Sequence, residues 1–324
     1  MLETFNIPLI LSIHDFFYIC PTVHLLDQNN TYCAGHCTAG EGQCPVPLQH
    51  FASIPGLKHG WVVDWRNQIS RLLRAADMIV APSRYVLDLY KSHFPDLSDR
   101  KLRVIEHGRN LEYQGDCAMP PTPGEPVRVL VPGVISRHKG APFIQQLAKL
   151  DGGKRLEFHF LGRIPPQLEG VGVEHGPYDV SEFQNRVRAI APSFIGFFSI
   201  WPETYGHVLT EAWSCGVPAL VLDIGTQADR IASHGGGWVL DPGDPGAAYR
   251  QILAISADAD AYAAQSEKAT LKGVPTLDDM GHDYDRLYRH VRFERRAFRS
   301  DGVALSRARK EGAEFPLRLA VIPQ

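Results

Sequence analysis

The sequence lacks a membrane-crossing segment, since no apolar run reaches the roughly 18 residues at which a spanning helix is expected. Its first residues also lack the basic-then-apolar pattern of a signal peptide. These two absences predict a cytoplasmic protein. An excess of one charge is missing as well, because 33 basic residues stand against 36 acidic ones. We therefore expect no nucleic acid partner, since that would need a clustered basic surface.

Cysteine is scarce, with six in 324 residues, and in a cytoplasmic chain thiols are expected to be reduced or metal-bound rather than paired as disulfides. Four of the six are nevertheless close in sequence: Cys20, Cys33, Cys37 and Cys44. Four thiolates can hold a tetrahedral zinc ion, so a structural zinc site is one interpretation. The paired Cys-x-x-Cys spacing is absent, and a reduced cluster that packs an irregular loop is the other interpretation.

A chain of this length, with 44% hydrophobic and 21% charged residues, is typical of a globular protein with two domains of about 150 residues each. Prolines gather between residues 115 and 126, which makes this segment the predicted linker. We expect a first domain over residues 1–122, with a cysteine-rich insert over 20–55. A second domain is expected over 123–280, followed by a C-terminal helix and tail over 281–324.

Short apolar runs alternate with segments of helical spacing on both sides of the linker. Before it, strands are predicted at residues 8–13, 77–83 and 102–105, and helices at 64–76 and 84–93, the second with Ser83 as its N-cap. After it, strands are predicted at 127–133, 156–162, 194–200, 217–222 and 237–240, and helices at 141–150, 181–190, 205–215, 246–272 and 281–299. This alternation predicts parallel sheets, with ligands bound beyond the carboxyl ends of the strands.

The loop from Gly133 to Gly140 carries two cations, Arg137 and Lys139, between a predicted strand and a predicted helix. Amides at a helix start and cationic side chains bind anions, so the loop is suited to a diphosphate. A solvated loop with two surface cations is the alternative.

Glu203 and Glu211 form a second candidate site, one in the loop after a buried strand and the other inside the next helix. Carboxylates accept hydrogen bonds from sugar and ribose hydroxyls, so the two could bind one ligand at different points. Two glutamates placed near a helix start are the alternative. His14 ends a strand of the first domain and could face the same cleft, or could be a hydrogen-bonded structural histidine.

These residues stand within a pattern that resembles a known family. Pro202-Glu203-Thr204-Tyr205-Gly206, followed by Leu209 to Pro218, is similar to the signature of retaining GT-B glycosyltransferases of the family-4 (group 1) type. The resemblance implies the GT-B fold, an α/β architecture of two Rossmann-like domains with parallel sheets. The family's first domain starts with a strand and a glycine-rich loop that we do not find here, so we expect this domain to be partial.

The resemblance also implies roles for the candidate residues. Glu203 would hold hydroxyls of the donor sugar, Glu211 would bind the ribose, and Lys139 with an arginine would neutralise the diphosphate. The family's usual arginine position is Val134 here, so Arg137 is the expected substitute. The remaining implied contacts are the donor-binding residues Gly133, Thr204, Tyr205 and Gly206 and, across the cleft, His14 near the reacting sugar carbon.

The implied function is transfer of a sugar, which we take to be a hexose, from a nucleotide-diphosphate sugar to a saccharide or lipid-linked acceptor with retention of configuration, as in polysaccharide biosynthesis. No cofactor is implied for catalysis. Arginines over 292–309 suggest either contact with anionic lipid or a solvated helix. The alternative function is a truncated GT-B protein that binds a nucleotide sugar or a partner without turnover.

If the four clustered cysteines hold zinc, the purified protein contains about one equivalent of the metal, because one tetrahedral site takes four thiolates. Elemental analysis of protein purified without added metal measures this content. Cys37→Ser should lower it, whereas Cys117→Ser, outside the cluster, should leave it unchanged. A zinc content well below one equivalent contradicts the zinc interpretation.

Overall fold

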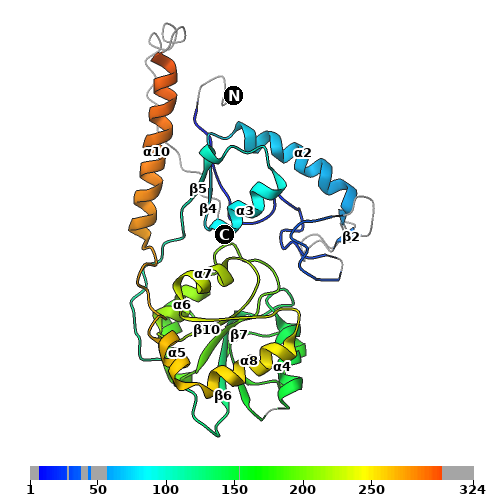
Figure 1. Cartoon of the computed structure of the whole chain (residues 1–324), viewed down its shortest axis with the longest axis vertical. Helices are drawn as coiled ribbons and strands as arrows, with labels where there is room; N and C mark the ends of the chain where they lie inside the picture. The colour runs from blue at the N-terminus through cyan, green and yellow to red at the C-terminus, as the bar shows by residue number, and fades with distance from the viewer. Residues whose placement is uncertain (1–6, 28, 38–42, 45–56, 153, 301–324) are drawn as a thin grey trace.

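A computed structural model describes residues 7–27, 29–37, 43–44, 57–152 and 154–300, without the side chains of 43–44, 57–61 and 293–300. Figure 1 shows two α/β units, the first half of the chain above the second, with one long helix beside the upper unit. Parallel sheets form both units, as the alternation of strands and helices predicts.

The first sheet, in the described residues, has three parallel strands in the order β1-β4-β5. Its central strand β4 is buried along its whole length, as is usual for a parallel strand covered on both faces. The elements are β1 (Ile10–Ser12), β2 (Gln43–Cys44), β3 (Leu57–Lys58), α2 (His59–Ala75), β4 (Met78–Ala81), α3 (Arg84–His93), the 3-10 turn η2 (Asp99–Lys101) and β5 (Leu102–Val104). Helix α3 begins where predicted, because the Ser83 side chain accepts a hydrogen bond from the Val86 amide.

The second sheet, over the residues that the structure describes, has six parallel strands in the order β11-β10-β9-β6-β7-β8. They are β6 (Val127–Val134), β7 (Leu156–Arg163), β8 (Val173–Glu174), β9 (Phe194–Phe197), β10 (Ala219–Leu222) and β11 (Gly237–Leu240). The chain builds outward from β6 to β8 and then returns to the other side of β6 with β9. Strand order therefore reverses between β6 and β9, and in open α/β sheets ligands bind beyond the carboxyl ends of strands at such a reversal.

Helices cover both faces of the second sheet (Figure 1). They are α4 (Ala141–Asp151), α5 (Phe183–Ile190), α6 (His207–Ser214), α7 (Thr226–His234), α8 (Pro245–Ala257) and α9 (Ala259–Ser266), with 3-10 turns η3 (Pro166–Leu168) and η4 (Val180–Glu182). Residues 246–272, predicted to be helical, form two helices, the second of which ends at Ser266. Asp258 ends α8 and its side chain accepts the Ala261 amide as the N-cap of α9, so two helices form.

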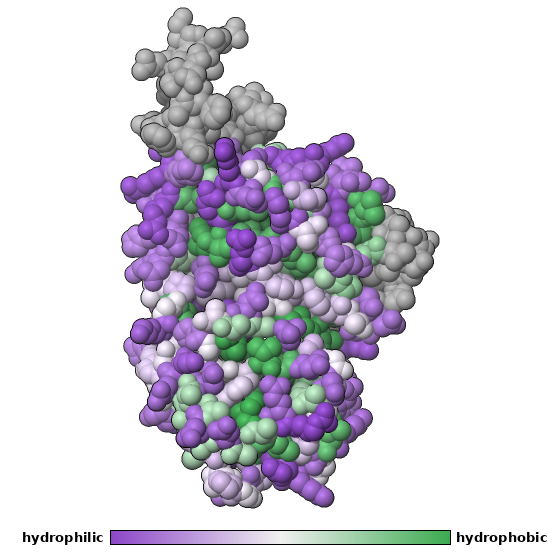
Figure 2. Space-filling model, in the orientation of Figure 1, coloured by the Kyte–Doolittle hydropathy of each residue, from purple (hydrophilic) through white to green (hydrophobic). Residues whose placement is uncertain are grey.

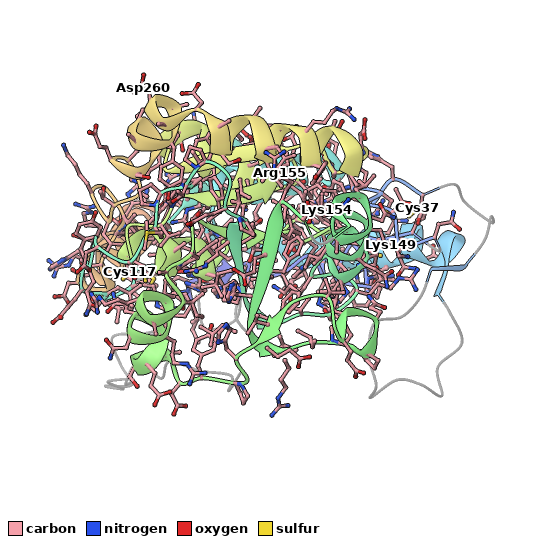
Figure 3. The ribbon with its side chains drawn as sticks, turned by 90° about the horizontal axis from the view of Figure 1, so that it is seen from below. Cys37, Cys117, Lys149, Lys154, Arg155 and Asp260 are labelled. Carbon is pink, nitrogen blue, oxygen red and sulfur yellow. The ribbon has the colours of Figure 1, made fainter. Side chains whose placement is uncertain are left out.

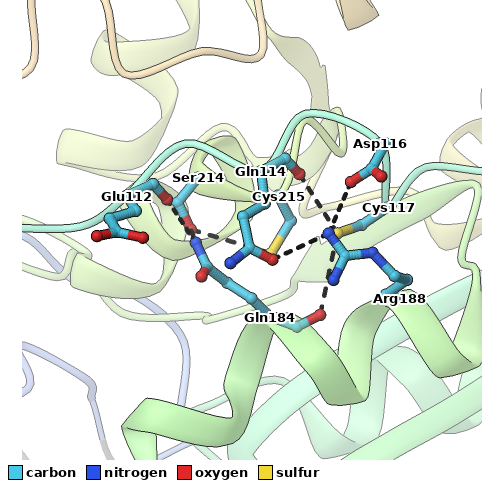
Figure 4. Close-up of polar contacts among 8 residues, drawn as sticks. All are labelled: Glu112, Gln114, Asp116, Cys117, Gln184, Arg188, Ser214 and Cys215. Carbon is cyan, nitrogen blue, oxygen red and sulfur yellow. Dashed lines mark hydrogen bonds and ion pairs between the residues drawn. The ribbon is translucent and has the colours of Figure 1, made fainter.

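The start of the predicted linker, with the residue before it, is attached to the second unit. Gln114 donates its amide to the Ser214 carbonyl at 2.7 Å, and Cys117 donates its amide to the Cys215 carbonyl at 3.3 Å. Arg188 of α5 bonds the side chains of Gln114 and Asp116 (Figure 4). The domain boundary at residue 122 remains a prediction.

The long helix α10 (Leu277–Ser300) packs back on the first sheet (Figure 1). Leu287 and Val291 of this helix form one apolar cluster with Met78 and Val80 of β4. Hydrogen bonding adds a contact, since the hydroxyls of Ser12 and Tyr284 lie 3.2 Å apart. The chain therefore runs from the first unit to the second and back again.

The two passages of the chain between the units lie side by side. Arg109 donates its amide to the Pro275 carbonyl at 3.1 Å, and Leu277 donates its amide to Oδ1 of Asn110 at 3.0 Å. Gly108 fits only because it has no side chain, since a Cβ there would lie 2.0 Å from the Thr276 carbonyl oxygen. We call residues 108–110 and 275–277 the crossing.

In the part of the chain that the structure describes, no helix is both long and apolar enough to span a bilayer. Figure 2 shows the hydrophobic residues of one face in several separate patches among hydrophilic ones. The side chains of the arginine-rich tail beyond Arg292, interpreted either as a lipid contact or as a solvated helix, lie outside the described residues.

Two glycine substitutions, one in the crossing and one in α10, should have opposite effects on the free energy of unfolding. Gly108→Ala should lower the free energy of unfolding by roughly 1–3 kcal/mol, because the new methyl group overlaps the Thr276 backbone. Gly281→Ala, on α10 with open space around it, should raise the free energy by up to about 1 kcal/mol, because alanine favours the helix. Urea unfolding measures both, and equal effects of the two substitutions would contradict the close approach.

Candidate functional site

The candidate site lies at the reversal of strand order, where the loops after β6 and β9 meet. Ile200 donates its amide to the His138 carbonyl at 3.0 Å, which joins the two loops. Gly140 has φ of +90°, and a Cβ there would lie 1.9 Å from the Phe198 carbonyl oxygen. Glycine is therefore required at this position, both for its conformation and for the approach of the second loop.

Lys139 and Glu203, two of the predicted residues, meet in this site. Lys139 Nζ forms an ion pair with Glu203 Oε1, which also accepts a 2.8 Å hydrogen bond from Ser199 Oγ. The ammonium group lies 5.6 Å from the centre of the Trp201 ring. The cation of one loop thus neutralises the carboxylate of the other.

Glu211, the third predicted residue, pairs with a cation that the sequence interpretation missed. Arg109 Nη2 lies 2.9 Å from Glu211 Oε1. Burial raises the pKa of Glu211, and the charge of Arg109 opposes this rise. Glu203 and Glu211 therefore each contact a different cation, and Arg109 comes from the segment after β5 of the first unit.

His14 of the first unit contacts the predicted donor-binding segment through its backbone. Its carbonyl accepts a 2.9 Å hydrogen bond from Thr204 Oγ1. Thr226 Oγ1 in turn donates to the Thr204 carbonyl at 3.1 Å and lies 2.8 Å from Ser83 Oγ, the N-cap of α3. The carboxyl ends of β1 and β4 thus lie directly against the second unit's site.

Three imidazoles, which we call the histidine stack, line up across the two units. The ring of His14 lies 5.3 Å from that of His107, and the ring of His107 lies 5.1 Å from that of His207. Burial, with smaller effects of neighbouring imidazoles or arginines, lowers the pKa of His107 and His207 to about 4. These two imidazoles are therefore neutral near pH 7.

The start of α6 is fixed by Gly206, at φ of +75°, and by Arg230. Arg230 Nη1 donates to the carbonyls of Tyr205 and Gly206 at 3.2 and 3.1 Å, and its guanidinium stacks on the Tyr205 ring at 4.2 Å. The Tyr205 side chain is buried. What this segment offers a ligand is its backbone, because the first amides of a helix have no partner within that helix.

Other predicted residues lie at the edge of this arrangement. Arg137 is exposed, and Val134, in the family's usual arginine position, is 67% exposed. Gly133 has φ of +94° near the carboxyl end of β6. His24, from the cysteine-bearing segment, stacks on His138 at 4.2 Å, so that segment contacts the loop carrying Lys139.

The clustered cysteines, where described, are free thiols in the core of the first unit, and Trp201 of the loop after β9 packs against the same core. Cys20 lies 3.2 Å from the Thr22 hydroxyl, and Cys33 and Cys37 donate to backbone carbonyls. Figure 3 shows Cys37 toward one end of the view and Cys117 toward the other. Cys117 contacts Gln184 of α5 and Cys215 after α6. Over the described residues no group of three metal-ligating side chains occurs. The side chain of Cys44 lies outside them, so the zinc site remains a prediction.

The model of the family described as glycosyl transferases group 1 matches residues 189–272. No match is found among curated proteins. Among solved structures, HepE from Anabaena, in complex with UDP and glucose, has a TM-score of 0.57 and 14% identity over 89% of this chain and 73% of that one. Sucrose-phosphate synthase from Thermosynechococcus elongatus has a TM-score of 0.54 and 18% identity over 70% and 62% of the two chains.

A glycosyltransferase from Rickettsia africae has a TM-score of 0.53 and 16% identity over 69% of this chain and 67% of that one. These likenesses confirm the predicted fold, the α/β architecture with parallel sheets that GT-B glycosyltransferases have. The matched residues 189–272 include Glu203 and Glu211, whereas Arg109 and Lys139 lie before them.

The histidine stack predicts acid sensitivity of the fold. The stabilisation from keeping His107 and His207 neutral is complete above the ordinary pKa of 6.5 and is lost as the pH falls toward about 4, because the unfolded chain then binds more protons. In His107→Asn, the free energy of unfolding should fall less steeply as the pH is lowered from 6.5 to about 4. Urea unfolding at each pH tests this, with His282→Asn on the exposed side of α10 as the control. An unchanged slope in His107→Asn would contradict the buried neutral imidazole.

Proposed function

We propose that the protein transfers a sugar from a nucleotide-diphosphate sugar to an acceptor with retention of configuration. The observation that carries the proposal is the placing of Glu203 and Glu211, each beside a cation, where strand order reverses at the carboxyl ends of parallel strands. Supporting observations are the family match over these glutamates and the likeness in fold to a protein solved with UDP and glucose.

The proposed roles follow the contacts that these side chains make in the structure. Glu203 accepts hydrogen bonds from hydroxyls of the sugar, and Glu211 accepts them from the ribose. Lys139, held beside Glu203, and the exposed Arg137 neutralise the diphosphate. The remaining proposed contacts are Gly133 and the backbone of Thr204, Tyr205 and Gly206 against the phosphates, and His14 near the reacting carbon.

Charge separation determines what this site must do. As the bond between the sugar carbon and the diphosphate oxygen breaks, positive charge develops on the sugar and negative charge on the diphosphate. Cations and helix-start amides already fixed in place stabilise the departing group without reorganising, which is typically the largest catalytic contribution. The acceptor hydroxyl then bonds to the sugar on the face that the diphosphate leaves, and its proton passes to the departing phosphate oxygen. No protein nucleophile takes part, so Glu203 need only bind.

The wider proposal concerns substrates and surroundings. We propose a hexosyl donor and a saccharide or lipid-linked acceptor, as in polysaccharide biosynthesis, in a cytoplasmic protein that contacts membrane peripherally. Lys139 and the helix-start amides balance the leaving group's charge, so no metal is needed in the reaction, and any zinc is structural. The proposed domains are residues 1–122, 123–280 and 281–324.

One observation favours a second function, binding without turnover. Val134 is exposed at the position where the resemblance implies an arginine beside the diphosphate. A site with one cation fewer could bind a nucleotide sugar and still stabilise the departing diphosphate too weakly for transfer. Affinity for the donor together with release of the nucleotide separates the two functions.

The proposal predicts that a nucleotide sugar raises the melting temperature of the protein and that Lys139→Met slows its turnover. UDP-, GDP- and ADP-sugars are first screened by thermal shift, and release of the nucleotide is then measured with the donor that binds. Loss of the ammonium should lower kcat roughly 100-fold, since one such donor contributes about 3 kcal/mol in comparable sites.

The matched control is Lys149→Met, an exposed lysine near the far end of α4, which should leave kcat unchanged. Stabilisation by no nucleotide sugar would count against the donor site itself. Binding without any nucleotide release, with or without a panel of saccharide acceptors, would support the non-catalytic function.

A further inference from the structure

Arg109 reaches one proposed donor carboxylate from the other unit of the protein. Its guanidinium bonds Glu211 at 2.9 Å, across a sequence separation of 102 residues. The Arg109 side chain is 25% exposed and that of Glu211 is 10% exposed. An ion pair in this setting is screened far less by salt and solvent than one on the open surface.

The backbone that carries Arg109 is held on both sides. Its own amide bonds the Pro275 carbonyl, and the next residue, Asn110, accepts the Leu277 amide. On the other side, Gly108 lies so close to Thr276 that even a methyl group would not fit. The guanidinium therefore extends from a fixed base, and less conformational entropy is lost when it orients a partner.

We propose that Arg109 is a positioning residue of the donor site, which keeps the Glu211 carboxylate charged and directed at the ribose of the nucleotide. This inference rests on the proposed function and adds to it a residue of the first unit. Arginine suits the task because its planar group has five donors and stays charged at every accessible pH. The hydrogen bond to Arg109 uses Oε1, and a carboxylate has about four acceptor sites in all, so capacity remains for ribose hydroxyls.

Burial makes the assistance of a cation necessary. Glu211 is 7% exposed, and this burial raises the pKa of its carboxyl group. The charge of Arg109 lowers that pKa. A protonated carboxyl is a weaker acceptor than a carboxylate. Without the guanidinium the pKa of Glu211 should rise further, so that a fraction of the protein near neutral pH would carry the weaker acceptor.

The other titratable groups whose charges act with that of Glu211 are Tyr178, before η4, and Cys215, after α6. Burial raises the pKa of Tyr178 to about 12, and the pKa of Cys215 is raised by its contact with Cys117 and by burial. Both stay uncharged between pH 6 and 9. His207, four residues before Glu211 on α6, also interacts with Arg109, but burial and Arg230 still hold its pKa below the ordinary value of 6.5 when Arg109 is replaced, so it stays neutral above that pH. A change in nucleotide binding that appears above pH 6.5 when Arg109 is replaced therefore reports on Glu211.

The test is calorimetric titration of UDP, GDP and ADP into the full-length protein between about pH 6 and pH 9. The nucleotide that binds best is then titrated into Arg109→Gln, which removes the charge and keeps a hydrogen-bond donor. At each pH, the dissociation constant of the nucleotide from the variant is divided by that from the wild type. This ratio cancels the titration of the nucleotide itself. We expect a loss of roughly tenfold at the acid end, the size of one hydrogen bond to a charged group, and recovery toward the alkaline end.

Three further variants complete the design. Arg109→Lys keeps the charge and should bind with the wild-type pH dependence. Glu211→Gln, the neutral carboxyl mimic, should bind weakly at every pH. Arg128→Met, which removes the arginine of an exposed ion pair with Glu157 at 3.2 Å, should bind as the wild type does.

Each outcome either supports the inference or overturns it. Equal affinity of Arg109→Gln and wild type at all pH values overturns it, and so does a loss that is the same at every pH. If Arg109→Gln does not fold, Arg109→Lys decides, because a pH-dependent loss in a variant that keeps the charge contradicts the role. A wild type that binds no nucleotide at all refutes the proposed function instead, before any variant is compared.

Discussion

The close approach of two loops at the reversal of strand order is the constraint on which the rest of the site depends. The loops after β6 and β9 can share a hydrogen bond and bring Lys139 to Glu203 only because residue 140 has no side chain. The two loops leave the carboxyl ends of β6 and β9, which are neighbouring parallel strands at the reversal of strand order, where open α/β sheets bind their ligands. The carboxylates and cations are placed by this geometry rather than by any one strong contact.

Much of the fold could be predicted because its determinants are local. The apolar runs that form β6, β7 and β9, and the serine cap of α3, act through spacing and chain chemistry within a few residues. Helix boundaries were less predictable. α2 begins at His59, ahead of the predicted Asp64, and α10 begins at Leu277, ahead of the predicted residue 281. The segment predicted to be helical over 246–272 is divided at Asp258, whose side chain caps α9.

The site was predictable only where its residues share a motif. Glu203, Glu211 and Lys139 follow strands of one unit, and their chemistry could be interpreted together. Arg109 and His107 follow β5 of the other unit, and nothing in their spacing relates them to α6. Contacts between units depend on how two sheets face each other, which no local pattern in the chain encodes. The zinc interpretation differs again, because it depends on a side chain outside the described residues.

The return of α10 to the first sheet has a consequence for the order in which the protein can form on the ribosome. Residues 127–266, which hold the second sheet and its covering helices, are continuous, so this unit can fold as soon as it has emerged. The apolar face of β4 at Met78 and Val80 is covered only when Leu287 and Val291 of α10 have been synthesised. These residues follow some two hundred positions later, which corresponds to about 10–40 s at typical rates of synthesis. The unit made first is thus completed last, and until then the apolar face of β4 is open to contact with other chains.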